Sequence, residues 1–222
     1  MTTKYNNLAK RMISILGLRG SPVGIALQDE IPLHVEKGRQ ARHCGMVQYA
    51  RLNKAEFYTT AEEQECKGGA GVIALMDIPE DVANGEFYYK LGSFASIKAS
   101  KNTIQLVPRL EHRSKAILYA SLDIASFSPD VVVVICNPKQ AMQLVQADLY
   151  KEGGRIETGF SGRLSLCGDI IANTMNTKRL QVSLACSGSR KHSKIEDNEL
   201  IVGIPGDRFI TLVDCLEKLF SK

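Results

Sequence analysis

The 222-residue sequence lacks any long apolar run that could cross a membrane. No stretch approaches the roughly 18 consecutive apolar residues that a membrane-spanning helix requires. The first seven residues also lack the apolar core of a secretory signal peptide. These absences predict a cytoplasmic protein with no membrane partner.

The sequence has little excess charge of either sign. Lys and Arg together number 28 and Asp and Glu number 24, so the formal net charge is +4. A domain dedicated to nucleic acid usually gathers a much stronger basic patch on one face. The mild excess predicts no nucleic-acid partner.

The sequence lacks several motifs that indicate a particular reaction or a metal site. With only four histidines, the chain has no His-Glu-x-x-His motif, and it has no Walker loop or Gly-x-Ser-x-Gly turn. The six cysteines form no Cys-x-x-Cys pair, which is the local signature of zinc ribbons and ferredoxins. Any site must therefore be assembled by the fold, and the catalytic residues and the reaction stay open.

The composition is otherwise that of a globular protein, with 44% hydrophobic and 23% charged residues and no Pro-rich or Ser-rich linker. It predicts one structural unit over residues 1–222, of mixed α/β (α+β) class. The apolar run 130–136 predicts a strand covered on both faces, and the polar run 188–198 predicts a mobile surface loop. Helices are expected at 4–17, from 44, at 93–106, 138–153, 165–175 and 207–220. Strands are expected at 21–27, 56–60, 72–75, 115–122, 130–136, 155–159, 180–185 and 199–204, with a glycine-rich turn at 66–71.

The two halves of the chain, approximately 1–122 and 123–222, repeat one order of elements. Each half carries a Cys-Gly and a Cys-x-Gly element, at Cys44 and Cys66 in the first and at Cys167 and Cys186 in the second. Glycine at these places allows close backbone approach. The repeat predicts two similar halves packed as one pseudo-symmetric unit, with the four cysteines meeting in a shared site.

Four cysteine thiolates can hold an iron–sulfur cluster or, as the second choice, a zinc ion. Dispersed ligands favour the cluster, because structural zinc usually takes local pairs. Two alternatives remain open: buried apolar cysteines that only fill space, and a metal-free thiol enzyme or small-molecule-binding protein with one reactive cysteine. Cys136 and Cys215 lie in apolar segments and are predicted core residues.

A small molecule or a redox partner would be expected near the metal. Asn137 and Gln140 lie where a strand passes into a helix, a common edge of a ligand crevice, and Arg190 follows Cys186 and could hold an anion. For Asn137 and Gln140, the alternative is a plain helix start. For Arg190 the alternative to anion binding is a surface salt bridge, and the same two readings apply to Arg51, which follows Cys44. His43, beside Cys44, could serve as a ligand or base, but a place in a surface loop is expected. A homodimer is the default oligomer.

Several motifs together resemble an uncharacterised archaeal and bacterial family, a domain of unknown function frequent in methanogens and other anaerobes. The resemblance covers nearly the whole chain and implies that the four motif cysteines recur in the family. An anaerobic setting is compatible with an oxygen-sensitive iron–sulfur centre. The motifs are Cys44-Gly-Met-Val-Gln-Tyr-Ala-Arg51, Cys66-Lys-Gly-Gly, Ser128-Pro-Asp-Val-Val-Val-Val, Asn137-Pro-Lys-Gln-Ala-Met, Cys167-Gly-Asp and Cys186-Ser-Gly-Ser-Arg190.

Overall fold

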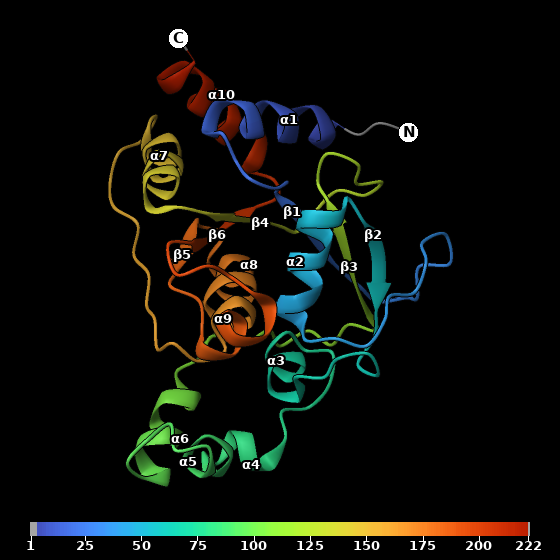
Figure 1. Ribbon diagram of the computed structural model, residues 1–222, viewed down its shortest axis with the longest axis vertical. Helices are drawn as coiled ribbons and strands as arrows, with labels where there is room; N and C mark the ends of the chain where they lie inside the picture. Colours follow the sequence, from blue (N-terminus) through green and yellow to red (C-terminus); the bar gives the residue numbers. More distant parts are fainter. Residues whose placement is uncertain (1–3, 222) are drawn as a thin grey trace.

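The computed structural model describes residues 4–221, in which a six-stranded antiparallel sheet carries helices on both faces (Figure 1). The mixed α/β class predicted from the sequence is confirmed. The strands are β1 (Val23–Gln28), β2 (Glu56–Thr59), β3 (Ala116–Ser121), β4 (Val131–Cys136), β5 (Gln181–Ser183) and β6 (Leu200–Pro205). Their order across the sheet is β2-β3-β1-β4-β6-β5.

The helices alternate irregularly with the strands along the chain. No helix among residues 4–221 is both long enough and apolar enough to span a bilayer. The helices are α1 (Lys4–Leu16), α2 (His43–Asn53), α3 (Lys67–Val72), α4 (Glu80–Ala83), α5 (Glu86–Lys90), α6 (Ile97–Gln105), α7 (Pro138–Leu149), the π-helix η1 (Ser165–Ala172), α8 (Asn173–Thr177), α9 (Ser187–Ser193) and α10 (Phe209–Phe220).

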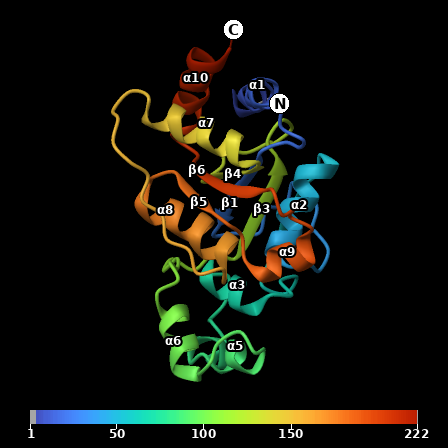
Figure 2. The same cartoon turned by 60° about the vertical axis from the view of Figure 1, so that its left-hand side comes forward.

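Two apolar cores lie on the two faces of the sheet. Helices α1, α7 and α10 cover one face, and α2, η1 and α8 cover the other (Figures 1 and 2). Successive side chains of a strand point to opposite faces, so Val131, Val133 and Ile135 enter one core while Val132, Val134 and Cys136 enter the other. The prediction of a strand covered on both faces is confirmed. Cys215 on α10 is buried in the same core as Cys136, as expected for both.

The centre of the sheet is the pairing of β1 with β4. Strands β1, β2 and β3 come from residues 1–122 and occupy one side of this seam, whereas β4, β5 and β6 come from 123–222 and occupy the other. In the seam Val23 pairs with Val133 and Ile25 with Val131, with Gly24 opposite Val132 between them. The seam places the two chain halves side by side in one sheet.

Four local predictions were wrong. The glycine-rich segment 67–72 is the helix α3, because its small residues allow close packing: a Cβ added at Gly71 would lie 2.6 Å from Ile78 Cγ1. Segment 72–75 contains the end of α3 and a turn with Ala74 at φ +56° instead of a strand. Segment 155–159 forms no strand, and residues 187–193 of the expected loop form α9.

The short helices α4, α5 and α6 form an insertion between α3 and β3. They contact one another and project from one end of the molecule (Figure 1). Val82 on α4 joins this insertion to the rest of the fold, since a Cβ added at Gly68 of α3 would lie 3.3 Å from Val82 Cγ1. The insertion therefore lies beside the N-terminal end of α3.

Candidate functional site: a cavity lined by four cysteines

The four motif cysteines line one cavity of about 690 Å³. Cys44 lies in the first turn of α2, Cys167 lies in the first turn of η1, and Cys66 and Cys186 immediately precede α3 and α9. Helices α2, α3 and α9 gather at the same end of the sheet in both views (Figures 1 and 2). The fold thus brings together four residues that are far apart in the sequence, two from each half.

Glycine is required where the sulfur atoms approach the backbone. A Cβ added at Gly69 would lie 2.8 Å from Cys167 Sγ and 3.4 Å from Cys66 Sγ. A Cβ added at Gly168 would lie 2.4 Å from Val107 Cγ1. These contacts let η1 of the second half pack against α3 of the first, with the two thiols on either side of one glycine.

The thiols affect one another electrostatically. Burial raises the pKa of the Cys44 thiol, and the nearby thiols of Cys186 and Cys66 raise it further. Burial, followed by the neighbouring Cys66, Cys44 and Cys186, raises the pKa of Cys167 well above its ordinary value. Ionising several thiols together is unfavourable unless a cation compensates their charge. Near pH 7 the raised pKa values keep the Cys44 and Cys167 thiols protonated.

Helix α9 donates hydrogen bonds at one side of the cavity. The backbone N–H of Ser189 donates to Cys186 Sγ at 3.3 Å, and Ser189 Oγ lies 2.9 Å from the same sulfur. One turn later, the nearby Ser193 hydroxyl opposes the rise in the pKa of Cys44. Donors of this kind stabilise thiolates and cluster sulfur.

His43 also lines the cavity, and its predicted place in a surface loop was wrong. The side chain is 1% exposed, and its Nδ1 lies 2.8 Å from the Tyr119 hydroxyl on β3. Burial lowers the pKa of His43 to about 3, so the imidazole is neutral near pH 7. Across residues 4–221, its Nε2 has no hydrogen-bond partner. The sequence position beside Cys44 was the one available signal for this residue.

The insertion of α4 to α6 forms a roof over the cavity. Burial raises the pKa of Tyr88 on α5, and Cys66, Cys167 and Cys186 contribute to the rise. The Arg163 guanidinium, from the chain before η1, lies 5.8 Å from the ring centroids of both Tyr88 and Phe94. An aromatic and cationic wall therefore faces the thiols, and no sequence motif had indicated it.

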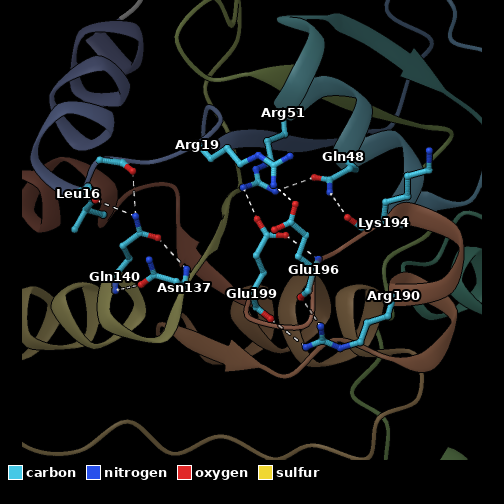
Figure 3. A network of polar contacts seen from close by, with 11 residues as sticks. Leu16, Arg19, Gln48, Arg51, Asn137, Gln140, Arg190, Lys194, Glu196 and Glu199 are labelled. Atoms are coloured by element: carbon cyan, nitrogen blue, oxygen red, sulfur yellow. Dashed lines mark hydrogen bonds and ion pairs between the residues drawn. The ribbon is translucent and has the colours of Figure 1, made fainter.

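A buried polar network ties the two cysteine-bearing helices α2 and α9 together (Figure 3). Arg51 on α2 donates to Glu199 Oε1 at 2.7 Å, with both side chains less than a tenth exposed. Gln48 bridges Arg51 and the Lys194 carbonyl. Arg51 thus forms a buried ion pair, where the alternative to anion binding had been a surface salt bridge.

Arg190, predicted to bind a ligand, belongs to the same network and does not line the cavity. Its guanidinium donates to the carbonyls of Leu184, Glu196 and Glu199. These hydrogen bonds hold the chain after α9 close to β6. The guanidinium therefore binds backbone carbonyls. Its geometry supports a structural role.

Asn137 and Gln140, the other predicted ligand-binding residues, also lie outside the cavity lining. They form a reciprocal capping box at the start of α7, and Gln140 Nε2 donates to the carbonyls of Leu16 and Gly17 (Figure 3). A capping box satisfies backbone N–H groups at a helix start. The pair fixes α7 against the end of α1.

Comparison with known proteins identifies the family. Residues 11–214 match DUF169, described as uncharacterised ArCR. The chain belongs to the DUF169 family. A protein of Methanocaldococcus jannaschii named "Uncharacterized protein MJ0308" is 37% identical over 214 residues, which are 94% of this chain and 92% of the relative. No solved structure matches the chain significantly. The resemblance to an uncharacterised domain family is confirmed.

The donor set of this DUF169 protein consists of four cysteine thiols that line one cavity. Within residues 4–221, no three His, Cys, Asp or Glu side chains are arranged to hold a metal ion. A single zinc ion needs its sulfur ligands about 2.3 Å from one point. The four thiols are the donor type that zinc and iron–sulfur clusters take, but as placed they form no metal site.

Alkylation tests whether the half-buried thiols of the cavity in this DUF169 protein are more accessible than its buried thiols. In metal-free protein at pH 8, iodoacetamide should modify the half-buried Cys44, Cys66 and Cys186 before the buried Cys136, Cys167 and Cys215. Burial raises the pKa of Cys136 to about 12, so little of it is thiolate at that pH. Peptide mass spectrometry gives the order, and early labelling of Cys136 would contradict it.

Proposed function

We propose that the protein binds one iron–sulfur cluster of four irons through Cys44, Cys66, Cys167 and Cys186. The observation that carries the proposal is that these four thiols, which no local motif joins, line the same cavity. Four cysteine thiolates are the ligand set of a four-iron cluster. Zinc is the second choice.

The charges around the thiols support a cationic centre. Two of the thiols have raised pKa values because they are buried and close to other thiols. Iron ions would offset the charge of the ionised sulfurs, and metal binding would release their protons. The hydrogen bonds from Ser189 to Cys186 would persist and would tune the electronic properties of the centre.

The spread of the four thiols favours the cluster over zinc. In a four-iron cube each thiolate binds a different iron, so the ligands need not converge on one point. A tetrahedral zinc site requires that convergence. Within residues 4–221 no three side chains are arranged to hold a metal ion, so the thiols would have to move to bind either centre.

We also infer that the two halves are related by a pseudo-two-fold axis through the β1–β4 seam. Outward from the seam, the order β1, β3, β2 on one side corresponds to β4, β6, β5 on the other. The pairing of Val23 with Val133 and of Ile25 with Val131 is reciprocal, as such an axis requires. Under this relation the counterpart of β6 in the first half is β3. The order of elements in the sequence had instead matched segment 72–75 with the strand at 199–204.

A bound cluster would supply electron transfer or Lewis-acid chemistry to a small molecule in the cavity. The cavity is open enough for half-buried Cys44, Cys66 and Cys186 to contact entering molecules. A redox partner would approach the same opening. We expect the four cysteines to recur throughout the DUF169 family, because each supplies one ligand.

Protein purified without oxygen gives the decisive measurement. We expect about four irons and a matching amount of sulfide per chain, with the brown absorption of a cluster. Iron without sulfide, or zinc at one ion per chain, would replace the cluster with a simple metal site. A folded, colourless and metal-free protein would overturn the proposal and leave a thiol enzyme or small-molecule-binding protein as the working hypothesis.

A further inference from the structure

One polar group at the cavity is buried and has no partner. His43 lines the cavity and is 1% exposed, yet its Nε2 makes no hydrogen bond within residues 4–221. Its Nδ1, across the ring, is held by Tyr119 at 2.8 Å. A buried polar atom without a partner is costly, so a group entering the cavity would gain by supplying one.

The neighbours of Tyr119 indicate which proton His43 presents. Gln64 Nε2 donates to the Tyr119 hydroxyl oxygen at 3.1 Å and to Thr59 Oγ1 at 2.9 Å. Because the Tyr119 oxygen accepts from Gln64, its own proton is available to His43 Nδ1. With the Tyr119 proton in that hydrogen bond, the neutral imidazole would carry its own proton on Nε2, the nitrogen without a partner.

Cations gather at the same cavity. Its lining includes Arg42, Lys67, Arg163 and Lys191, opposed by the carboxylates of Glu65 and Asp81. Within residues 4–221, no ion pair includes Arg42, Arg163 or Lys191. Arg42 and Lys191 both lie close enough to His192 to lower its pKa, after the effect of burial. The cavity therefore offers unpaired positive charge near a buried neutral donor.

Apolar and aromatic side chains make up another part of the cavity lining. Val82, Phe87, Tyr88 and Leu91 of the α4–α5 roof form it together with Leu164 and Leu166. A cavity of about 690 Å³ has the size of a small-molecule site. The occupant that suits both parts of the lining has an anionic head and a compact apolar body.

We propose that the cavity binds a small organic carboxylate, with His43 Nε2 donating to its head group and Arg42 and Lys191 neutralising its charge. This inference deepens the proposed function and rests on it in one respect. The group beside the bound carboxylate would be the proposed cluster of the four cysteines. The carboxylate lies against the roof of α4 and α5, beside the thiols. It would be the small molecule on which the centre acts.

Ligand-observed NMR with benzoate and its neutral analogue benzamide tests the proposal on the full chain. We expect benzoate to bind measurably and benzamide at least about tenfold more weakly, because charge-assisted hydrogen bonds are lost. In the variant Arg42→Gln/Lys191→Gln, benzoate affinity should also fall at least about tenfold. The control Lys139→Gln/Lys218→Gln removes two exposed charges on α7 and α10, over the other face of the sheet, and should bind like the parent.

The buried histidine is tested by a pair of variants. His43→Gln keeps an N–H donor and should retain more benzoate affinity than His43→Leu, which has none. If the buried substitutions prevent folding, the surface double variant decides. Equal binding of benzoate and benzamide, no benzoate binding, or unchanged affinity in Arg42→Gln/Lys191→Gln would overturn the proposal.

Iron and sulfide measured on the same samples separate this inference from the proposed function. The double variant Arg42→Gln/Lys191→Gln should keep its iron while losing benzoate affinity. Specific benzoate binding by a protein that never holds iron would disprove the proposed cluster and support the carboxylate site. A full cluster without benzoate binding would support the proposed cluster and disprove the carboxylate site.

Discussion

Replacing Cys167 with alanine is expected to reduce the bound iron from about four atoms per chain to less than about one. Cys167 is the most deeply buried of the four cavity cysteines, and three other thiols influence its pKa. Removing one of four ligands leaves an iron open to water and to loss. Iron and sulfide analysis of protein purified without oxygen measures the effect, and the variants Cys44→Ala, Cys66→Ala and Cys186→Ala should behave alike.

Cys215→Ala is the matched control for this series. Cys215 is 2% exposed and Cys167 is 7% exposed, but Cys215 lies in the core on the other face of the sheet. The control loses a buried thiol and leaves the cavity intact, so it should keep the parent's iron content. Full iron in all four cavity variants would disprove ligation by these cysteines.

Replacing Arg51 with methionine should lower the free energy of unfolding by about 3–5 kcal/mol. The substitution leaves Glu199 buried without its cation, and an uncompensated buried charge is strongly destabilising. The double variant Arg51→Met/Glu199→Leu removes both charges and should recover most of the loss. Urea denaturation followed by circular dichroism gives the three values.

An exposed ion pair provides the comparison. Arg11 on α1 pairs with Asp214 and Glu217 on α10, and all three side chains are more than a third exposed. Arg11→Met should cost less than about 1 kcal/mol, because water screens surface pairs. A loss for Arg51→Met no larger than that for Arg11→Met would show that the buried pair does not hold α2 to α9.

The cysteine cavity illustrates what sequence patterns can predict. A cysteine followed closely by glycine, repeated in both halves, was enough to select Cys44, Cys66, Cys167 and Cys186 and to expect them together. Close packing explains only part of this signal, because an added Cβ would be crowded at Gly168 and Gly68 but would meet ordinary contacts at Gly45 and Gly188. The alternation of β4 between two cores was likewise visible as an uninterrupted run of apolar residues.

Other features of the site have no local signal. His43 is surrounded in sequence by polar residues, and its burial comes from β3, about 75 residues away. Helix α3 contains three glycines, which disfavour helix formation, and tertiary packing against Ile78 and the sulfurs overrides that preference. The roof of α4 to α6 follows from long-range packing that periodicity does not encode.

The seam between β1 and β4 has a consequence for folding. It joins the two halves by three residue pairs, fewer than the six that join β1 to β3 or β4 to β6. Cys66 and Cys167 lie on opposite sides of this seam and roughly 100 residues apart in the chain. A centre bound by both would act as a cross-link that closes a long loop, and long loops gain most from closure. Loading the centre would make the unfolding of one half depend on the other.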